Sequence, residues 1–130
     1  MACIEHLAIW AEDLDQTCRF YEKYFGARIG ELYHNPVKGF RSRFLSFEKG
    51  ARLEVMSTAT LSLVPVEPGA QVRGLTHLAL SVGSEAAVDA LTARLQADGF
   101  PVLDGPRRTG DGYYESVILD PEGNRVEVTV

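Results

Sequence analysis

The stretch that decides the fold is IEHLAI at residues 4–9, which returns as LTHLAL at residues 75–80. Each copy sets one histidine in a short apolar run. Each copy is followed, at nearly equal separation, by a second matching stretch, RLEV at residues 52–55 and RVEV at residues 125–128. These matches indicate an internal duplication that covers about half of the chain per copy.

The duplication repeats chemistry as well as hydrophobic pattern. His6 and Glu54 in the first copy are equivalent to His77 and Glu127 in the second. Taken singly, a histidine or a glutamate in a strand is more often a structural or solvated residue than a ligand. Two imidazoles and two carboxylates at matched positions instead favour one divalent metal site, because carboxylates buried together without a cation would lose hydration and repel each other.

Composition predicts one compact domain. The chain has 130 residues, 45% of them hydrophobic, which suffices for a real core. Its net charge of −5 and pI near 5.1 argue against nucleic-acid and acidic-membrane partners. No apolar run long enough to span a membrane and no signal-like leader is found, so we expect a soluble cytoplasmic protein. Its two cysteines cannot form a disulfide framework.

The first half predicts a strand, a helix and three further strands. Asp13 can cap the helix, and Gly26 can end it in a left-handed conformation. The strands are expected at residues 3–10, 27–34, 40–48 and 51–57. Residues 58–73, which include Pro65, Pro68 and Gly69, read as a linker.

The second half repeats this order. A helix is expected between Ser84 as its cap and Gly99 as its end, and residues 107–112 read as a loop. The strands are expected at residues 74–82, 101–104, 113–119 and 125–130. The fold class is therefore α+β, a single domain (residues 1–130) of two tandem βαβββ units, about 1–57 and 74–130, forming a curved, cup-like mixed sheet with helices outside.

Strand alternation predicts where the four candidate ligands point. Leu53 and Val55 face away from Glu54, and the valines that flank Glu127 face away from it. The apolar side should pack on a helix. We therefore expect His6, Glu54, His77 and Glu127 all to lie on the face opposite the helices.

On these residues the chain resembles the glyoxalase/bleomycin-resistance/extradiol-dioxygenase superfamily, also called the vicinal oxygen chelate family. The resemblance covers essentially the whole chain. Its other marks are FYEKYFG at residues 20–26 and the ending DPEGNRVE at residues 120–127. The ending is a strong mark of the superfamily and a weak mark of any one activity.

The resemblance implies a metal-dependent lyase or isomerase. Glyoxalase I members use a His-Glu-His-Glu ligand set, which this chain matches at His6, Glu54, His77 and Glu127. A divalent Zn, Ni, Co or Mn ion would polarise a carbonyl and stabilise an enediolate, with Glu127 or Glu54 as the catalytic base. Extradiol dioxygenases and fosfomycin-resistance enzymes use three protein ligands, so Glu54 argues against both.

Two positions depart from bacterial glyoxalase I. Trp10 stands where that family has an arginine that helps to hold glutathione, and Thr58 stands where it has an asparagine. Loss of both polar groups argues against lactoylglutathione as the substrate. Trp10 would present a flat apolar surface, which favours a smaller or partly aromatic α-hydroxycarbonyl or oxyanion-bearing compound.

Four residues are candidates for substrate binding: Trp10, Tyr113, Glu115 and Arg43. By resemblance to the fosfomycin enzymes, Glu115 should face the site and act there as an acid or base. An equally weighted alternative is that Glu115 pairs with Arg41, Arg43 or Arg125 across the sheet. Arg107 and Arg108 read as solvated loop charges.

The resemblance also implies a homodimer, with the site completed either within one chain or across two. Two other function classes stay open beside the isomerase or lyase. One is a binding or resistance protein that sequesters a small toxic compound, which Trp10 favours. The other is an extradiol dioxygenase, which would need Fe²⁺ and O₂.

Overall fold

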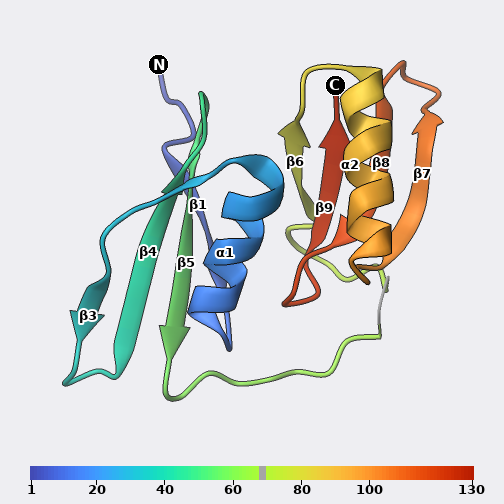
Figure 1. Cartoon of the computed structure of the whole chain (residues 1–130). Coiled ribbons are helices and arrows are strands. Elements are labelled where there is room, and N and C mark those ends of the chain that lie inside the picture. The colour runs from blue at the N-terminus through green and yellow to red at the C-terminus, as the bar shows by residue number, and fades with distance from the viewer. Residues whose placement is uncertain (68–69) are drawn as a thin grey trace. The chain divides into compact units, whose positions relative to one another are not determined.

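The computed structural model describes residues 1–67 and 70–130 and divides the chain into two compact units (Figure 1). The first unit runs from Met1 to Val64 and the second from Pro65 to Val130. The boundary lies within the segment 58–73, in which Pro68 and Gly69 fall outside the described residues. Each unit consists of one open sheet and one helix.

The first unit contains a mixed sheet in the order β1-β5-β4-β2, with a short strand β3 added beside β4. Strand β1 runs parallel to β5. Strands β2, β3 and β5 each pair antiparallel with β4. The elements are β1 (His6–Trp10), α1 (Leu14–Phe25), β2 (Arg28–Ile29), β3 (Tyr33–Asn35), β4 (Phe40–Ser46) and β5 (Arg52–Thr58).

Local sequence signals determine both ends of α1. The Asp13 carboxylate accepts a hydrogen bond from the backbone N–H of Gln16 at 2.9 Å, which satisfies one of the unpaired donors of the first turn. Gly26 ends the helix in the left-handed region with φ of 66°, and its N–H donates to the Glu22 carbonyl. Both expected helix boundaries are confirmed.

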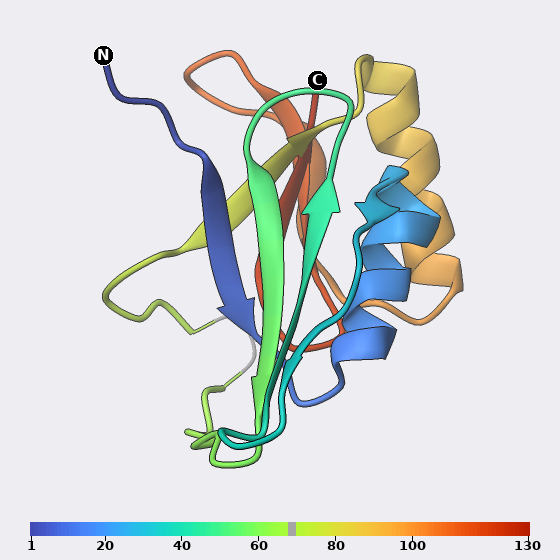
Figure 2. The ribbon, with the colours of Figure 1, turned by 90° about the vertical axis from the view of Figure 1, so that its left-hand side faces the viewer.

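One face of the first sheet packs on α1, and Figure 2 shows the helix beside the strands of its own unit. Leu45, Leu53 and Val55 are at most 3% exposed on this face, where they meet the buried side of α1. Leu53 and Val55 flank Glu54 in β5, so alternation turns Glu54 to the opposite, open face. The packing of α1 thus decides which face of the sheet carries the candidate ligands.

The second unit repeats this arrangement with the strand order β6-β9-β8-β7. Strand β6 is parallel to β9, and the other two pairings are antiparallel. Val88 and Leu95 of the helix and Val126 and Val128 of β9 are fully buried. The elements are β6 (His77–Ser81), α2 (Glu85–Ala97), β7 (Val102–Arg108), β8 (Tyr114–Leu119) and β9 (Arg125–Thr129).

A buried hydrogen bond joins α2 to its sheet. The Thr92 and Ser116 hydroxyls lie 2.7 Å apart, and Thr92 also donates to the Val88 carbonyl at 2.6 Å. Both side chains are at most 3% exposed, so this pair satisfies polar atoms inside the core. It also places Ser116 on the helix side of β8, which turns its neighbour Glu115 to the open side.

The predicted fold class is confirmed: the chain is α+β and consists of two repeated units with open mixed sheets. Two details of the prediction are wrong: residues 27–34 form two short strands rather than one, and Arg107 and Arg108 belong to β7 rather than to a loop. The expected end of the second helix is confirmed, because α2 ends at Ala97 with Asp98 as its cap, and Gly99 follows with φ of 92°.

Candidate functional site

The first unit brings His6 and Glu54 together on its open face. Strand β1 pairs in parallel with β5, and this register sets Ala8 opposite Glu54. The His6 Nε2 atom lies 3.8 Å from the Glu54 carboxylate. The Glu54 side chain is 16% exposed, so the pair is accessible from solvent yet partly screened by its neighbours.

A second carboxylate orients the His6 ring. Glu5 forms a short hydrogen bond with His6 Nδ1, and its other oxygen accepts from the Arg52 guanidinium, through Nε at 2.8 Å and through Nη2. The hydrogen bonds to His6 and Arg52 lower the pKa of Glu5, and the bond to His6 has the larger effect. An anionic Glu5 that accepts a hydrogen bond from the Nδ1–H of His6 leaves the lone pair of the ring on Nε2, the nitrogen that faces Glu54.

The second unit brings His77 and Glu127 together in the same way. Their atoms Nε2 and Oε2 are 3.2 Å apart, and the register of β6 on β9 sets Ala79 opposite Glu127. Thr76 stands where the first copy has Glu5. The two copies therefore share the imidazole–carboxylate pair and differ in what precedes the imidazole.

Glu115 extends the second pair into a longer polar network. Register places Val117 opposite Glu127 and Glu115 opposite Thr129, so Glu115 and Glu127 share the open face. Glu115 is only 8% exposed, and its carboxyl group hydrogen-bonds to Glu127. Burial, then this hydrogen bond and the Glu127 charge, raise the pKa of Glu115, although Arg107 acts in the opposite direction.

Arg107 is the cation of this network. Its Nη1 atom lies 3.8 Å from the Glu115 carboxylate, and its Nε atom lies 2.6 Å from that of Asp104. Arg107 therefore takes the place that we assigned to Arg41, Arg43 or Arg125 as the alternative partners of Glu115. The prediction that Arg107 and Arg108 lie in a loop is wrong, because both belong to β7; Arg108 is exposed, as predicted, and pairs with Glu85.

The remaining predicted site residues lie in different places. Trp10 is on the open face of the first sheet, two residues beyond Ala8 on β1. Arg43 is paired in register with Val55, so it lies on the helix side, and its guanidinium donates to the Gly30 carbonyl at 2.8 Å. The structure thus does not bring Arg43 to His6 and Glu54. Tyr113 precedes β8 in a turn and is 57% exposed.

The types of donor atom in each pair suit a divalent ion. Two ligand atoms at about 2.1 Å from one ion lie roughly 3.0–3.4 Å apart. The separation of 3.2 Å in the second pair is within this range, whereas the separation of 3.8 Å in the first pair is wider. Neutral imidazole and carboxylate are a ligand set that fits Zn and its neighbours. Among the described residues, no three potential ligands gather at one point.

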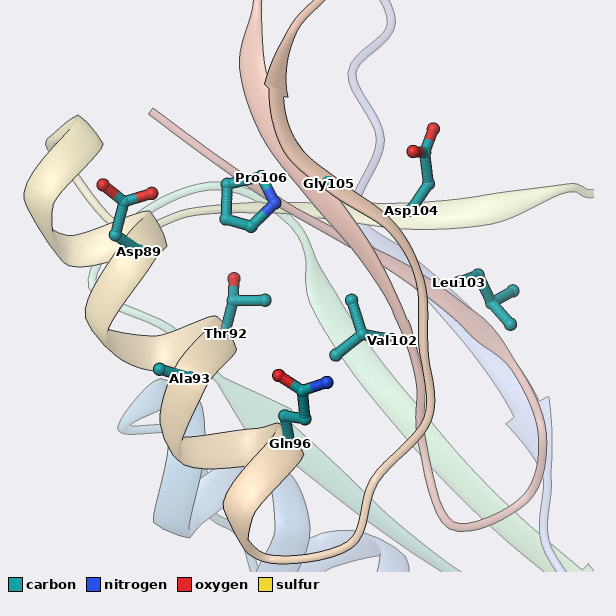
Figure 3. A pocket seen from close by; sticks show the side chains of 9 residues that line it. All are labelled: Asp89, Thr92, Ala93, Gln96, Val102, Leu103, Asp104, Gly105 and Pro106. Carbon is teal, nitrogen blue, oxygen red and sulfur yellow. The ribbon is translucent and has the colours of Figure 1, made fainter.

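A pocket of about 440 Å³ lies on the other side of the second sheet (Figure 3). It opens between α2 and β7, where Thr92 and Gln96 from the helix face Val102 and Pro106 from the strand. Because Thr92 bonds to the helix side of β8, the sheet itself separates this pocket from Glu127. The pocket is therefore not part of the candidate metal site.

Two repeated βαβββ-type units with open mixed sheets are the architecture of the vicinal oxygen chelate class. The chain matches the model of the Glyoxalase/Bleomycin resistance protein/Dioxygenase superfamily over residues 3–128, and it belongs to that superfamily.

Known proteins agree with this assignment. An uncharacterized protein of Pseudomonas aeruginosa is 32% identical over 132 residues, which cover 95% of this chain and 85% of that protein. A glyoxalase family protein from Enterococcus faecalis is 25% identical with a TM-score of 0.76, covering 98% of this chain and 96% of that one. A glyoxylase/bleomycin resistance protein/dioxygenase domain from Frankia sp. is 17% identical with a TM-score of 0.81, covering 100% and 98%.

The described residues contain no helix that is long and apolar enough to cross a membrane.

Proposed function

We propose that the chain is a metal-dependent, glyoxalase-like lyase or isomerase that acts on a small α-hydroxycarbonyl or related compound. The observation that carries the proposal is the repeated pair: each unit sets a histidine Nε2 against a carboxylate on the open face of its sheet. His6, Glu54, His77 and Glu127 would together hold one divalent ion, Zn, Ni, Co or Mn. Membership of the superfamily supports this proposal.

The bound ion would supply Lewis acidity, which polarises the substrate carbonyl and makes the neighbouring C–H bond more acidic. The protein supplies the proton transfer. A carboxylate oxygen of Glu127 would take the proton from the hydroxyl-bearing carbon and return it to the former carbonyl carbon, while the hydroxyl proton moves to the former carbonyl oxygen, so that the product is an isomer of the substrate. We assign this role to Glu127 rather than to Glu54 because Glu127 shares the open face of its sheet with a second, largely buried carboxyl group, that of Glu115.

Solvent exchange tests this chemistry without knowledge of the natural substrate. Zn-, Ni-, Co- and Mn-loaded protein is incubated with hydroxyacetone in D₂O, and loss of the CH₂ signal is followed by NMR. We expect exchange well above that of buffer with the same free metal. Glu127→Gln should abolish the excess, whereas Glu48→Gln, on an exposed position next to β4, should not change it. An exchange rate equal to the metal control in every case contradicts the proposal.

A second candidate function is a small-molecule binding or resistance protein of the same fold. The exposed ring of Trp10 favours it, because a binding protein needs an apolar contact surface but no proton acceptor. An assay with methylglyoxal plus glutathione tests glutathione-linked chemistry. Turnover above the uncatalysed rate would support that chemistry despite Trp10 and Thr58. We place extradiol dioxygenase chemistry third, because those enzymes use three protein ligands for the metal, and Glu54, beside His6, would be a fourth.

A further inference from the structure

Three aromatic side chains gather on the open face of the first sheet. The Phe40 ring lies between the other two, with ring centres 6.1 Å from Trp10 and 6.0 Å from Tyr33. Both contacts are edge-to-face, at 88° and 60°. We call Trp10, Phe40 and Tyr33 the aromatic platform.

The strand registers place the platform on the same face as His6 and Glu54. Trp10 follows His6 by two alternations on β1, so both side chains point the same way. On β4, Phe44 is paired with Glu54 and its ring meets the His6 ring at 5.3 Å, and Phe40 precedes Phe44 by two alternations. At about 3.3 Å per residue, Trp10 lies roughly 13 Å along β1 from His6 and roughly 7 Å from Ala8, the residue opposite Glu54.

The aromatic platform is more exposed to solvent than is usual for aromatic side chains on a sheet. Trp10 is 47% exposed and Tyr33 is 57% exposed, whereas large aromatic side chains on a stable sheet normally bury most of their surface. The side chain between His6 and Trp10 on this face of β1 is only Ala8. A small side chain there leaves room for a ligand to reach from the platform to the His6–Glu54 pair.

The side chains that flank the platform are uncharged. Register on β5 and β4 sets Met56, Thr58 and Ser42 beside the rings on the same face. The nearest guanidinium on this face, that of Arg52, lies over the Phe44 ring and is bound to Glu5, at the His6 end. The platform therefore suits a neutral planar group rather than a carboxylate or a phosphate.

We propose that the aromatic platform binds an aryl group of the substrate, while the hydroxycarbonyl end of the same molecule reaches the Glu54 carboxylate, which is the near end of the His6–Glu54 pair. This inference rests on the proposed function and specifies its substrate class as aryl-bearing α-hydroxycarbonyl compounds. Ring stacking and apolar burial against Trp10 supply the selectivity. An alkyl compound of the same chemistry lacks both contacts.

The test compares 2-hydroxyacetophenone with hydroxyacetone, which carry the same reactive group on a phenyl ring and on a methyl group. Binding to Zn-loaded protein is measured by calorimetry. It is also followed by fluorescence, which reports on the platform directly because Trp10 is the single tryptophan of the chain. The variants are Trp10→Ala, Trp10→Phe and, as the matched control, Leu63→Ala at an exposed apolar residue beyond β5.

We expect the aryl compound to bind roughly tenfold more tightly than the methyl compound, as ring contacts of this kind permit. The preference should fall at least about threefold in Trp10→Ala, largely return in Trp10→Phe and persist in Leu63→Ala. Equal affinities in the parent protein, or a preference that Trp10→Ala leaves unchanged, overturn the inference. So does a dimer that dissociates in Trp10→Ala while the two probes bind alike, because a second copy would then cover the platform.

The two proposals fail in different ways. If the aryl preference depends on Trp10 but metal-loaded protein shows no solvent exchange above the metal control, the platform is supported and the metal-dependent function is contradicted. If both probes bind with equal affinity only when metal is present, the metal site is supported and the platform is overturned. Absence of binding by either probe to Zn-loaded protein overturns the platform as well.

Discussion

Glu5 hydrogen-bonds to Nδ1 of His6, the residue that follows it, and so fixes which ring nitrogen faces Glu54. Neighbouring residues in a strand point to opposite faces, but Glu5 precedes β1 and escapes that alternation. Its carboxylate is itself held by Arg52, which pairs in register with His6. The first copy of the repeat thus carries a carboxylate that supports its imidazole, and the second copy has Thr76, which carries no carboxylate, at the equivalent position.

The Glu5 contact predicts a change in metal affinity without loss of fold. Glu5→Gln removes the charge that keeps the proton on Nδ1, so we expect metal binding to weaken about 10-fold, as for other carboxylates that support a histidine ligand. Competition with a chelating dye measures the affinity. Glu12→Gln, at another exposed glutamate of the same unit, serves as the control. Identical affinities for Glu5→Gln and the parent would show that Glu5 does not support the site.

Glu115 predicts a pH dependence of stability in metal-free protein. Its folded pKa is raised by burial and by Glu127, so the folded state holds this proton to higher pH than the unfolded chain does. The resulting stabilisation is fully present below the unfolded pKa of about 4.3 and is lost as pH rises through the raised folded pKa.

Urea unfolding between pH 4 and 8 measures this effect as the difference between the parent and Glu115→Gln. We expect the free energy of unfolding of the parent to fall with rising pH relative to the variant, which cannot titrate at this position. Parallel pH profiles for the two proteins would rule out a raised pKa for Glu115.

The two cysteines should differ sharply in reactivity. Burial raises the pKa of the Cys18 thiol to about 11, and Cys18 is 1% exposed in α1, whereas Cys3 is exposed. Since the thiolate is the reactive form, Ellman's reagent at pH 8 should modify one thiol quickly in the folded protein and two in denaturant. Cys3→Ser should remove the fast phase. A fast reaction that survives Cys3→Ser contradicts the buried position of Cys18.

The Thr92–Ser116 hydrogen bond predicts a moderate cost in stability. Ser116→Ala removes one partner while Thr92 keeps its bond to the Val88 carbonyl, so we expect a loss of about 0.5–1.5 kcal/mol. Ile118→Ala, two residues along the same face of β8, removes fully buried apolar volume and should cost about 2–5 kcal/mol. Chemical unfolding ranks the two variants. A larger loss for Ser116→Ala than for Ile118→Ala would contradict this description of the core.

Much of the fold was predictable because its signals are local. Asp13 and Gly26 act within one turn of α1, and the alternation around Glu54 requires only Leu53 and Val55 as buried neighbours. The repeat then predicted the second unit from the first. These features depend on residues close in sequence, which is why they could be read before the structure was known.

The misreadings arise where long-range pairing overrides the local pattern. Residues 27–34 leave the sheet after Gly30, whose N–H bonds to the Phe44 carbonyl and where an added Cβ would lie 2.9 Å from that oxygen. Arg107 joins β7 because a register shift after Asp104 lets the strand continue past Gly105 and Pro106. Nothing in the neighbouring sequence indicates that register shift, so the pairing of Glu115 with Arg107 could not be predicted.

The metal content of variants in each unit tests the central claim most directly. Protein reconstituted with Zn and freed of excess metal is measured by elemental analysis, for the parent, His6→Ala and His77→Ala. His34→Ala is the matched control, since His34 is the third histidine and pairs with Arg41 on the helix side of the first sheet.

The account predicts one zinc ion per chain in the parent protein. The ion should be lost in both His6→Ala and His77→Ala and kept in His34→Ala. Retention of the ion in either of the first two variants, or no ion in the parent, would contradict a single site built from His6, Glu54, His77 and Glu127.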